Sequence, residues 1–101
     1  MATRCLIVLH LEFWKGTSAN FEGHFIMKSN DRILMEIKKE INKATIDFPK
    51  YQLNLTTENN ETYHITDCWI DKFEFENHEY DCTKCYFLCN DIQQLNIPTK
   101  R

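Results

Sequence analysis

The sequence predicts one α+β domain, in which a single amphipathic helix packs on a largely antiparallel β-sheet. Apolar residues recur at steps of three and four only between residues 29 and 49, whereas the other apolar runs alternate with a period of two. A chain of 101 residues holds one hydrophobic core, so we treat residues 1–101 as a single domain. The expected order is β-β-α-β-β-β, for which a β-grasp-like arrangement is one solution, although the order alone does not determine strand pairing.

The first two strands are expected to form a β-hairpin. Residues 4–14 alternate, and because the first half of this run is apolar on both faces, it predicts a central strand. Residues 15–20 are rich in turn formers, and residues 21–27 alternate again. The second run therefore returns alongside the first and leads into the helix.

The helix is expected over about residues 31–48. Ser29, Asn30 and Asp31 offer side-chain oxygens for the unpaired amides of a first turn, and Pro49 lacks the amide that a further turn would need. The apolar stripe on one face is formed by Leu34, Ile37, Ile41 and Phe48. A helix of this length is marginal alone in water, so we expect the stripe to pack on the strands.

A second hairpin is expected after the helix. Residues 51–56 alternate cleanly, and the next apolar run, residues 62–76, is unusually long for one strand. One face of that run would place Asp67 and Asp71 in an otherwise aromatic row. We therefore expect a bulge or break between residues 66 and 72, which would turn these carboxylates outward.

The last expected strand covers residues 80–89. It places Cys85, Phe87 and Cys89 on one side. The tail, residues 90–101, has little periodicity, and we expect it to fray. No repeat, low-complexity tract or linker divides the chain.

Acidic residues are concentrated in one quarter of the chain. The net charge is −3, and eight of the fifteen acidic residues lie between residues 58 and 81, where Lys72 is the one basic residue. A nucleic-acid-binding protein needs a basic stripe to neutralise phosphates, so this distribution argues against direct nucleic-acid binding and allows a basic protein partner. A solvated sheet face is the alternative explanation.

The acidic stretch also carries aromatic side chains, which makes it the expected partner-binding surface. Aromatic rings supply buried area at an interface, and carboxylates select a basic partner. The residues expected to contact the partner are Asp67, Trp69, Asp71, Glu74, Glu76, Glu79, Tyr80 and Asp81. The alternative is that the phenylalanines of this stretch belong to the core and its acids face solvent.

A second hypothesis is a zinc-stabilised module. Four potential ligands lie within twelve residues: His78, Cys82, Cys85 and Cys89. Three features count against zinc. The Cys-x-x-Cys pair has no second pair, Thr83-Lys84 offers neither glycine nor proline for a knuckle turn, and the two cysteines would point to opposite faces of a continuous strand. Buried structural thiols are the alternative, so no metal or cofactor is expected.

A third hypothesis is a small phosphoesterase. His64-Ile65-Thr66 has the His-x-Thr form that such enzymes use in pairs, with one imidazole protonating the leaving oxygen and the other activating the nucleophile. The sequence contains no second copy and only two glycines, which form no phosphate-binding loop. We therefore expect that the protein is not an enzyme.

The leading hypothesis is a small cytoplasmic interaction or inhibitor protein. Five cysteines, an odd number, follow no recognisable secretory signal, which predicts reduced thiols in the cytosol. No apolar run is long enough for a membrane span. Phage anti-defence (anti-CRISPR-like) proteins and toxin-immunity proteins share this size, acidity and lack of catalytic motifs. We expect the chain to cover a basic surface of a partner, such as a nucleic-acid-handling enzyme.

Overall fold

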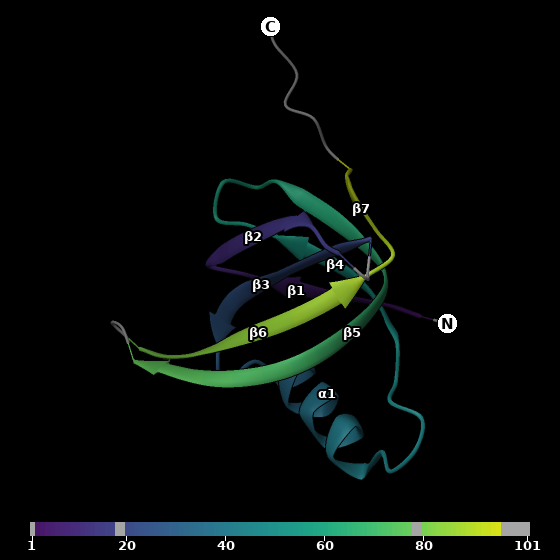
Figure 1. Cartoon of the computed structure of the whole chain (residues 1–101). Coiled ribbons are helices and arrows are strands. Elements are labelled where there is room, and N and C mark those ends of the chain that lie inside the picture. Colours follow the sequence, from purple (N-terminus) through teal and green to yellow (C-terminus); the bar gives the residue numbers. More distant parts are fainter. Residues whose placement is uncertain (1, 18–19, 78–79, 96–101) are drawn as a thin grey trace, which may run out of the picture.

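One helix and seven strands make up the fold of the computed structural model, which describes residues 2–17, 20–77 and 80–95 (Figure 1). The elements in chain order are β1 (Thr3–Ile7), β2 (His10–Lys15), β3 (Phe21–Lys28), α1 (Arg32–Lys43), β4 (Tyr51–Thr56), β5 (Thr62–Asn77), β6 (Asp81–Cys89) and β7 (Asp91–Gln94). The predicted α+β class and both predicted hairpins, β2–β3 and β4–β5, are confirmed. Helix α1 is too short and too polar to cross a membrane, and the described residues contain no other helix.

The strands form one mixed sheet. Its order is β1-β4-β5-β6-β3-β2, and β7 adds to the free side of the first half of β5. All strand pairs are antiparallel except β1 and β4, which run parallel. The strand order differs from that of a β-grasp sheet, so the suggested β-grasp arrangement is wrong.

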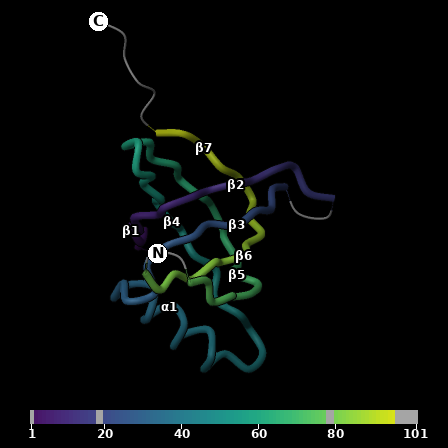
Figure 2. The backbone as a smooth tube through the Cα atoms, turned by 90° about the vertical axis from the view of Figure 1, so that its left-hand side faces the viewer, coloured from purple at the N-terminus to yellow at the C-terminus, as the bar shows by residue number. Residues whose placement is uncertain are grey.

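The two end strands of this order are consecutive in the chain, and the sheet closes on itself through them. The Val8 amide donates a 2.9 Å hydrogen bond to the Thr56 carbonyl on β4, and the Leu9 amide donates a 2.7 Å bond to the Ile26 carbonyl on β3. Two adjacent residues therefore contact β4, which is the neighbour of β1 at one end of the order, and β3, which is the neighbour of β2 at the other end. The sheet curls around the core as a result (Figures 1 and 2).

The prediction of one central N-terminal strand is wrong. The run is split between β1 and β2, and β1 pairs with β4 alone. Leu6 and Val8 are buried, whereas Cys5 and Ile7 face solvent. Apolar residues on both faces therefore do not make this strand central, since nothing in the described chain covers its outer face.

Helix α1 begins where the sequence predicts and ends about five residues earlier. The Asp31 carboxylate accepts hydrogen bonds from the amides of Ile33 and Leu34, at 2.8 and 3.1 Å. The last helical residue is Lys43, and Ala44 is already extended with ψ 131°. Residues 45–48 include β-branched side chains, an aspartate and a residue that precedes proline, all of which disfavour a further helical turn.

The expected irregularity in β5 is confirmed. Asp67 has a φ of 51°, the left-handed region, and the register with β4 shifts at this point. A second shift, against β6, lies between Ile70 and Lys72. Before the irregularity the odd-numbered Ile65 points inward, and after it the even-numbered Cys68 and Ile70 do. Asp67 and Asp71 therefore stay out of the core.

The core lies inside the curled sheet, with α1 on one side of it (Figures 1 and 2). The helix contributes Leu34 and Ile37, both fully buried. The other side chains of this buried core are Leu6, Val8, Phe25, Met27, Tyr51, Leu53, Leu55, Ile65, Cys68, Ile70, Cys85, Phe87 and Cys89. The last predicted strand is confirmed as β6, with its odd-numbered residues inward.

The C-terminal prediction is wrong for residues 91–94. They form β7, whose backbone pairs with Tyr63 to Thr66 on β5, and Ile92 packs against the core. A short strand with one buried side chain has almost no periodicity to detect, which explains the error. Residues 96–101 lie outside the described part of the chain.

Candidate functional site

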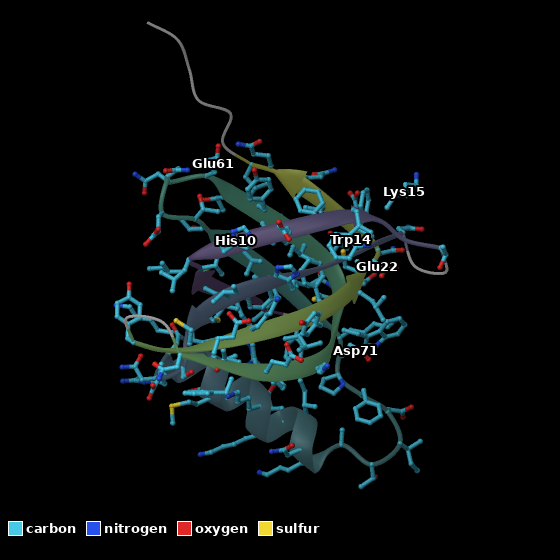
Figure 3. The ribbon with its side chains drawn as sticks, turned by 60° about the vertical axis from the view of Figure 1, so that its left-hand side comes forward. His10, Trp14, Lys15, Glu22, Glu61 and Asp71 are labelled. Atoms are coloured by element: carbon cyan, nitrogen blue, oxygen red, sulfur yellow. The ribbon has the colours of Figure 1, made fainter. Side chains whose placement is uncertain are left out.

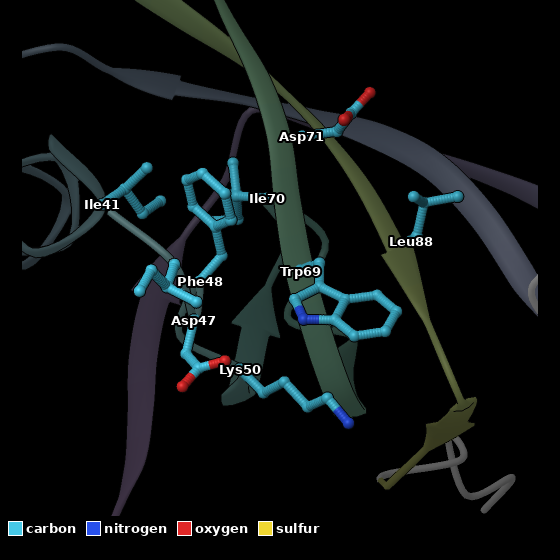
Figure 4. A pocket seen from close by; sticks show the side chains of 9 residues that line it. Ile41, Asp47, Phe48, Lys50, Trp69, Ile70, Asp71 and Leu88 are labelled. Carbon is cyan, nitrogen blue, oxygen red and sulfur yellow. The ribbon is translucent and has the colours of Figure 1, made fainter. Parts of the chain in front are cut away.

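An open apolar groove of about 790 Å³ lies between the end of α1 and the outer face of β5 and β6 (Figure 4). Its lining residues are Ile41, Ile46, Asp47, Phe48, Lys50, Trp69, Ile70, Asp71 and Leu88. The volume falls within the range of ordinary ligand and peptide sites. Six of these nine side chains are apolar, so the groove offers a mainly hydrophobic surface to solvent.

One wall of the groove is the segment after the helix, residues 44–50. Because α1 stops at Lys43, the side chains of Ile46 and Phe48 no longer continue the helical stripe onto the core. Ile46 is 85% exposed and Phe48 is 59% exposed. The predicted packing of Phe48 on the strands is therefore wrong, and this ring stands at the groove instead (Figure 4).

The other wall is formed by Trp69 and Leu88, which pair across β5 and β6. Trp69 follows the irregularity at Asp67, which directs its side chain outward while Cys68 and Ile70 point into the core. The indole is 42% exposed, and Lys50 Nζ lies 4.8 Å from its ring centroid. The irregularity at Asp67 and the segment that follows α1 therefore place Trp69 and Phe48 at the same groove.

Carboxylates outnumber cations around the groove. Asp47 and Asp71 line it directly, and Asp67 lines a smaller adjoining pocket that shares Lys50 and Trp69. Asp67 Oδ1 also accepts a 2.7 Å hydrogen bond from Gln52 Nε2. Three carboxylates against one lysine make the rim of an apolar groove net negative.

The structure brings together only three of the residues that the sequence predicts for partner binding. Asp67, Trp69 and Asp71 lie at the groove. Glu74 and Glu76 lie farther along β5, and at the rise of an extended strand Glu76 is about 23 Å from Trp69. Glu79 lies outside the described residues.

Tyr80 and Asp81 belong to a different hollow. They line it together with Lys28 and Met35, at the end of β6 away from the groove. Lys28 Nζ lies 4.7 Å from the centroid of the Tyr80 ring. The predicted surface is therefore divided between two ends of the β5–β6 hairpin.

The two glutamates between these ends are paired within the sheet. Glu74 forms a 3.0 Å ion pair with Lys72 and accepts a 2.8 Å hydrogen bond from the Tyr86 hydroxyl. These bonds, that of Lys72 first, lower the pKa of Glu74. Glu76 lies 3.8 Å from Lys84. The carboxylates of the predicted surface do not form the single exposed patch that the sequence analysis assumed.

The predicted zinc cluster is divided by the sheet. Cys85 and Cys89 point into the core, whereas the alternation of β6 places Cys82 on the opposite face, as expected for a continuous strand. Burial raises the pKa of Cys85 to about 12 and that of Cys89 to about 11. In residues 2–17, 20–77 and 80–95, these cysteines belong to no group of three potential metal ligands. His78 lies outside the described residues.

The His-x-Thr residues lie in the first half of β5. His64 Nδ1 is 2.7 Å from Asn54 Oδ1 on β4, within hydrogen-bonding distance. His64 pairs with Gln93 on β7, and Thr66 with Asp91. The imidazole is half-buried between neighbouring strands and lines none of the hollows described above.

A cluster of two histidines and one glutamate on β2 and β3 was missed by the sequence analysis. His10 Nε2 lies 3.5 Å from Glu12 Oε2, and His24 Nε2 lies 3.3 Å from Glu12 Oε1. Burial first, and then the charge of Lys84, lower the pKa of His24 and favour its neutral imidazole. The signal that could have found it is His10-x-Glu12 on one face of a predicted hairpin whose second strand carries His24.

No protein-family model matches the chain, and comparisons with curated proteins and with solved structures gave no significant match. The function is therefore inferred from the geometry of the chain's own residues.

Proposed function

We propose that this chain is a small protein-interaction module that binds its partner through the groove between Phe48 and Trp69. The exposure of Ile46, Phe48 and Trp69 around one concavity carries this proposal. Monomeric proteins rarely expose several large apolar side chains next to one another unless the surface binds something. Aromatic residues are also the most frequent anchors of protein interfaces.

Covering the groove would provide substantial binding free energy. A fully buried aromatic side chain removes about 150–250 Å² from water, and about half of Phe48 and of Trp69 remains to be covered. At about 25 cal/mol per Å², each ring would contribute on the order of 2–3 kcal/mol to association. Two such anchors are sufficient for an interface hot spot.

The charges at the rim select the partner's chemistry. Asp47, Asp67 and Asp71 surround the apolar floor, and Lys50 is the one basic residue among those that line the two hollows. A partner segment that inserts an apolar side chain and carries lysine or arginine beside it would complement both features. We therefore still propose a basic partner, which would bind at the groove and not along the whole stretch from Asp67 to Asp81.

A blocking role follows from such a partner. Proteins that handle nucleic acids present basic surfaces to phosphates, and a module seated on one of these surfaces would exclude the nucleic acid. The inhibitor class considered above comprises phage anti-defence and toxin-immunity proteins. We propose this class as the biological setting of the groove.

The test is capture of a partner by the purified chain and by matched variants. Immobilised wild-type protein and the double variant Phe48→Ala/Trp69→Ala are incubated with a lysate of the source organism, and bound proteins are identified by mass spectrometry. Phe75→Ala is the matched control, because Phe75 is 66% exposed on the same strand but does not line the groove.

The expected result is a basic protein retained by wild type and F75A and lost with F48A/W69A. Binding of that protein to nucleic acid should then fall in the presence of the wild-type chain. Equal capture by F48A/W69A and wild type would remove the groove as the binding surface. Loss of capture with F75A would place the surface elsewhere on β5.

A further inference from the structure

We propose that His10, Glu12 and His24 form a binding site for a zinc ion. The three side chains lie on the outer face of the β2–β3 hairpin, and their ligand atoms are all within 4.8 Å of one another. Two imidazoles and one carboxylate are a ligand set that zinc uses when it keeps a coordination position open to water. This site is separate from the groove and does not depend on the proposed function.

The register of the β2–β3 hairpin brings His10, Glu12 and His24 together. His10 and Glu12 are two residues apart on β2 and therefore project from the same face. Glu12 pairs directly with His24 on β3, and His10 pairs with Ile26, the next residue on that face. The rings of His10 and His24 are 5.7 Å apart. Figure 3 shows His10 and Trp14 on β2.

The observed separations suit tetrahedral coordination. Ligand atoms 2.0–2.1 Å from a tetrahedral zinc are about 3.3 Å from one another. Glu12 Oε1 lies 3.3 Å from His24 Nε2 and Glu12 Oε2 lies 3.5 Å from His10 Nε2, so each imidazole is at about this distance from one carboxylate oxygen, and a rotation of the half-exposed carboxylate brings a single oxygen to both. The imidazoles need to approach each other, and the half-exposed side chain of His10 can rotate to do so.

The backbone holds two of the ligands rigidly. A Cβ on Gly23 would lie 2.1 Å from the Glu12 carbonyl oxygen and 2.7 Å from Phe13 Cα. Glycine at position 23 therefore lets β2 cross β3 at unusually close range, next to His24. The His24 side chain is 12% exposed and lies against the rings of Trp14 and Tyr86, at 6.4 and 5.8 Å.

The solvent side of the cluster is open. About half of His10 and of Glu12 is exposed, so water can reach an ion held between them. Three protein ligands with a water in the remaining position is the arrangement of zinc sites that bind or activate small molecules. A structural zinc site would instead be closed by four protein ligands.

The experiment is a zinc titration of the untagged chain by isothermal calorimetry. A His10→Ala variant removes a half-exposed ligand without touching the core, and His24→Ala removes the more buried one. His64→Ala is the matched control, because it deletes an imidazole on β5 outside the cluster. Thermal melts establish that each variant is folded.

We expect one zinc per chain for wild type and H64A, and binding weaker by at least about tenfold for H10A and H24A. Nitrogen chemical shifts of the imidazoles, recorded during the titration, should move for His10 and His24 among the four histidines. Absence of saturable zinc binding by wild type overturns the proposal. So does equal affinity of H10A, or a shift confined to the other two histidines.

Discussion

The Tyr51 hydroxyl donates a 2.8 Å hydrogen bond to Glu40 Oε1 and so joins the start of β4 to α1. Arg4 Nη2 donates to both oxygens of the same carboxylate, at 3.1 and 3.0 Å. Three elements, β1, α1 and β4, therefore meet at one glutamate. The hydrogen bonds from Tyr51 and then Arg4 lower the pKa of Glu40, while burial first and Glu40 second raise the pKa of Tyr51.

Replacing Glu40 by glutamine should reduce stability in a pH-dependent manner. Since the folded-state pKa of Glu40 is depressed, its carboxylate contributes stability above the unfolded-state pKa and loses it as pH falls through the folded-state pKa. The difference in free energy of unfolding between wild type and E40Q should be below about 1 kcal/mol at pH 7, because the group is partly exposed.

Urea denaturation at several pH values measures this difference, which should shrink toward zero below about pH 4. Glu36→Gln is the control, because Glu36 is an exposed residue of the same helix. A difference for E40Q that grows as pH falls would contradict the assigned role of the carboxylate.

Alanine at position 23 should destabilise the fold. A Cβ there would overlap the Glu12 carbonyl oxygen, so β2 would have to move away from β3. Such overpacking costs about 1–3 kcal/mol, and thermal or urea unfolding measures it. Because the closest atom belongs to the backbone, the double variant Gly23→Ala/Phe13→Ala should remain destabilised. Full rescue by F13A would mean that only the Phe13 side chain opposes the methyl group.

Removal of apolar side chains from the predicted helical stripe should have two distinct outcomes. Ile37→Ala should cost about 2–5 kcal/mol, because Ile37 is fully buried. Phe48→Ala should change the free energy of unfolding by no more than about 0.5 kcal/mol, because Phe48 lies beyond the end of α1 and is exposed. A large loss for F48A would indicate that the helix continues to residue 48 and buries this ring.

The five cysteines should separate by thiol reactivity. Cys5 is exposed and the other four are buried. A pKa of about 12 for Cys85 leaves only about one thiolate in ten thousand at pH 8, and the thiolate is the reactive form. Iodoacetamide at pH 8 should therefore modify Cys5 first, and all five only in denaturant. Mass spectrometry of Cys5→Ser gives the control, and rapid labelling of C5S in its native state would contradict the burial.

Local features of this fold could be predicted from the sequence, and long-range pairing could not. Two carboxylates in an aromatic row were enough to predict an irregularity between residues 66 and 72, which the structure places at Asp67, and the side-chain acceptors at residues 29–31 marked the start of the helix, where Asp31 is the N-cap. The end of the helix was misjudged because Phe48 keeps the helical spacing, although the local propensities of residues 45–48 oppose a helix. The break at Val8 and Leu9 leaves no local pattern, since it follows from where β3 and β4 lie.

In the candidate site, too, the residues that local sequence marks could be predicted, and those that depend on long-range structure could not. Trp69 and Asp71 were selected because an acidic, aromatic segment is unusual in itself. Phe48 was assigned to the buried helical stripe, and Ile46 was not selected at all, because the exposure of both depends on where α1 ends. The cluster of His10, Glu12 and His24 requires the register of a hairpin, which alternation alone does not determine.

The order of assembly follows from the position of β6. This strand pairs with β5 on one side and β3 on the other, yet it is made late, at residues 81–89. A nascent chain that has reached only residue 77 would lack the strand that pairs with β3 and with the second half of β5, which would leave these strands open to neighbouring chains. Synthesis of residues 81–89 thus supplies the missing partner to two strands that were made before it.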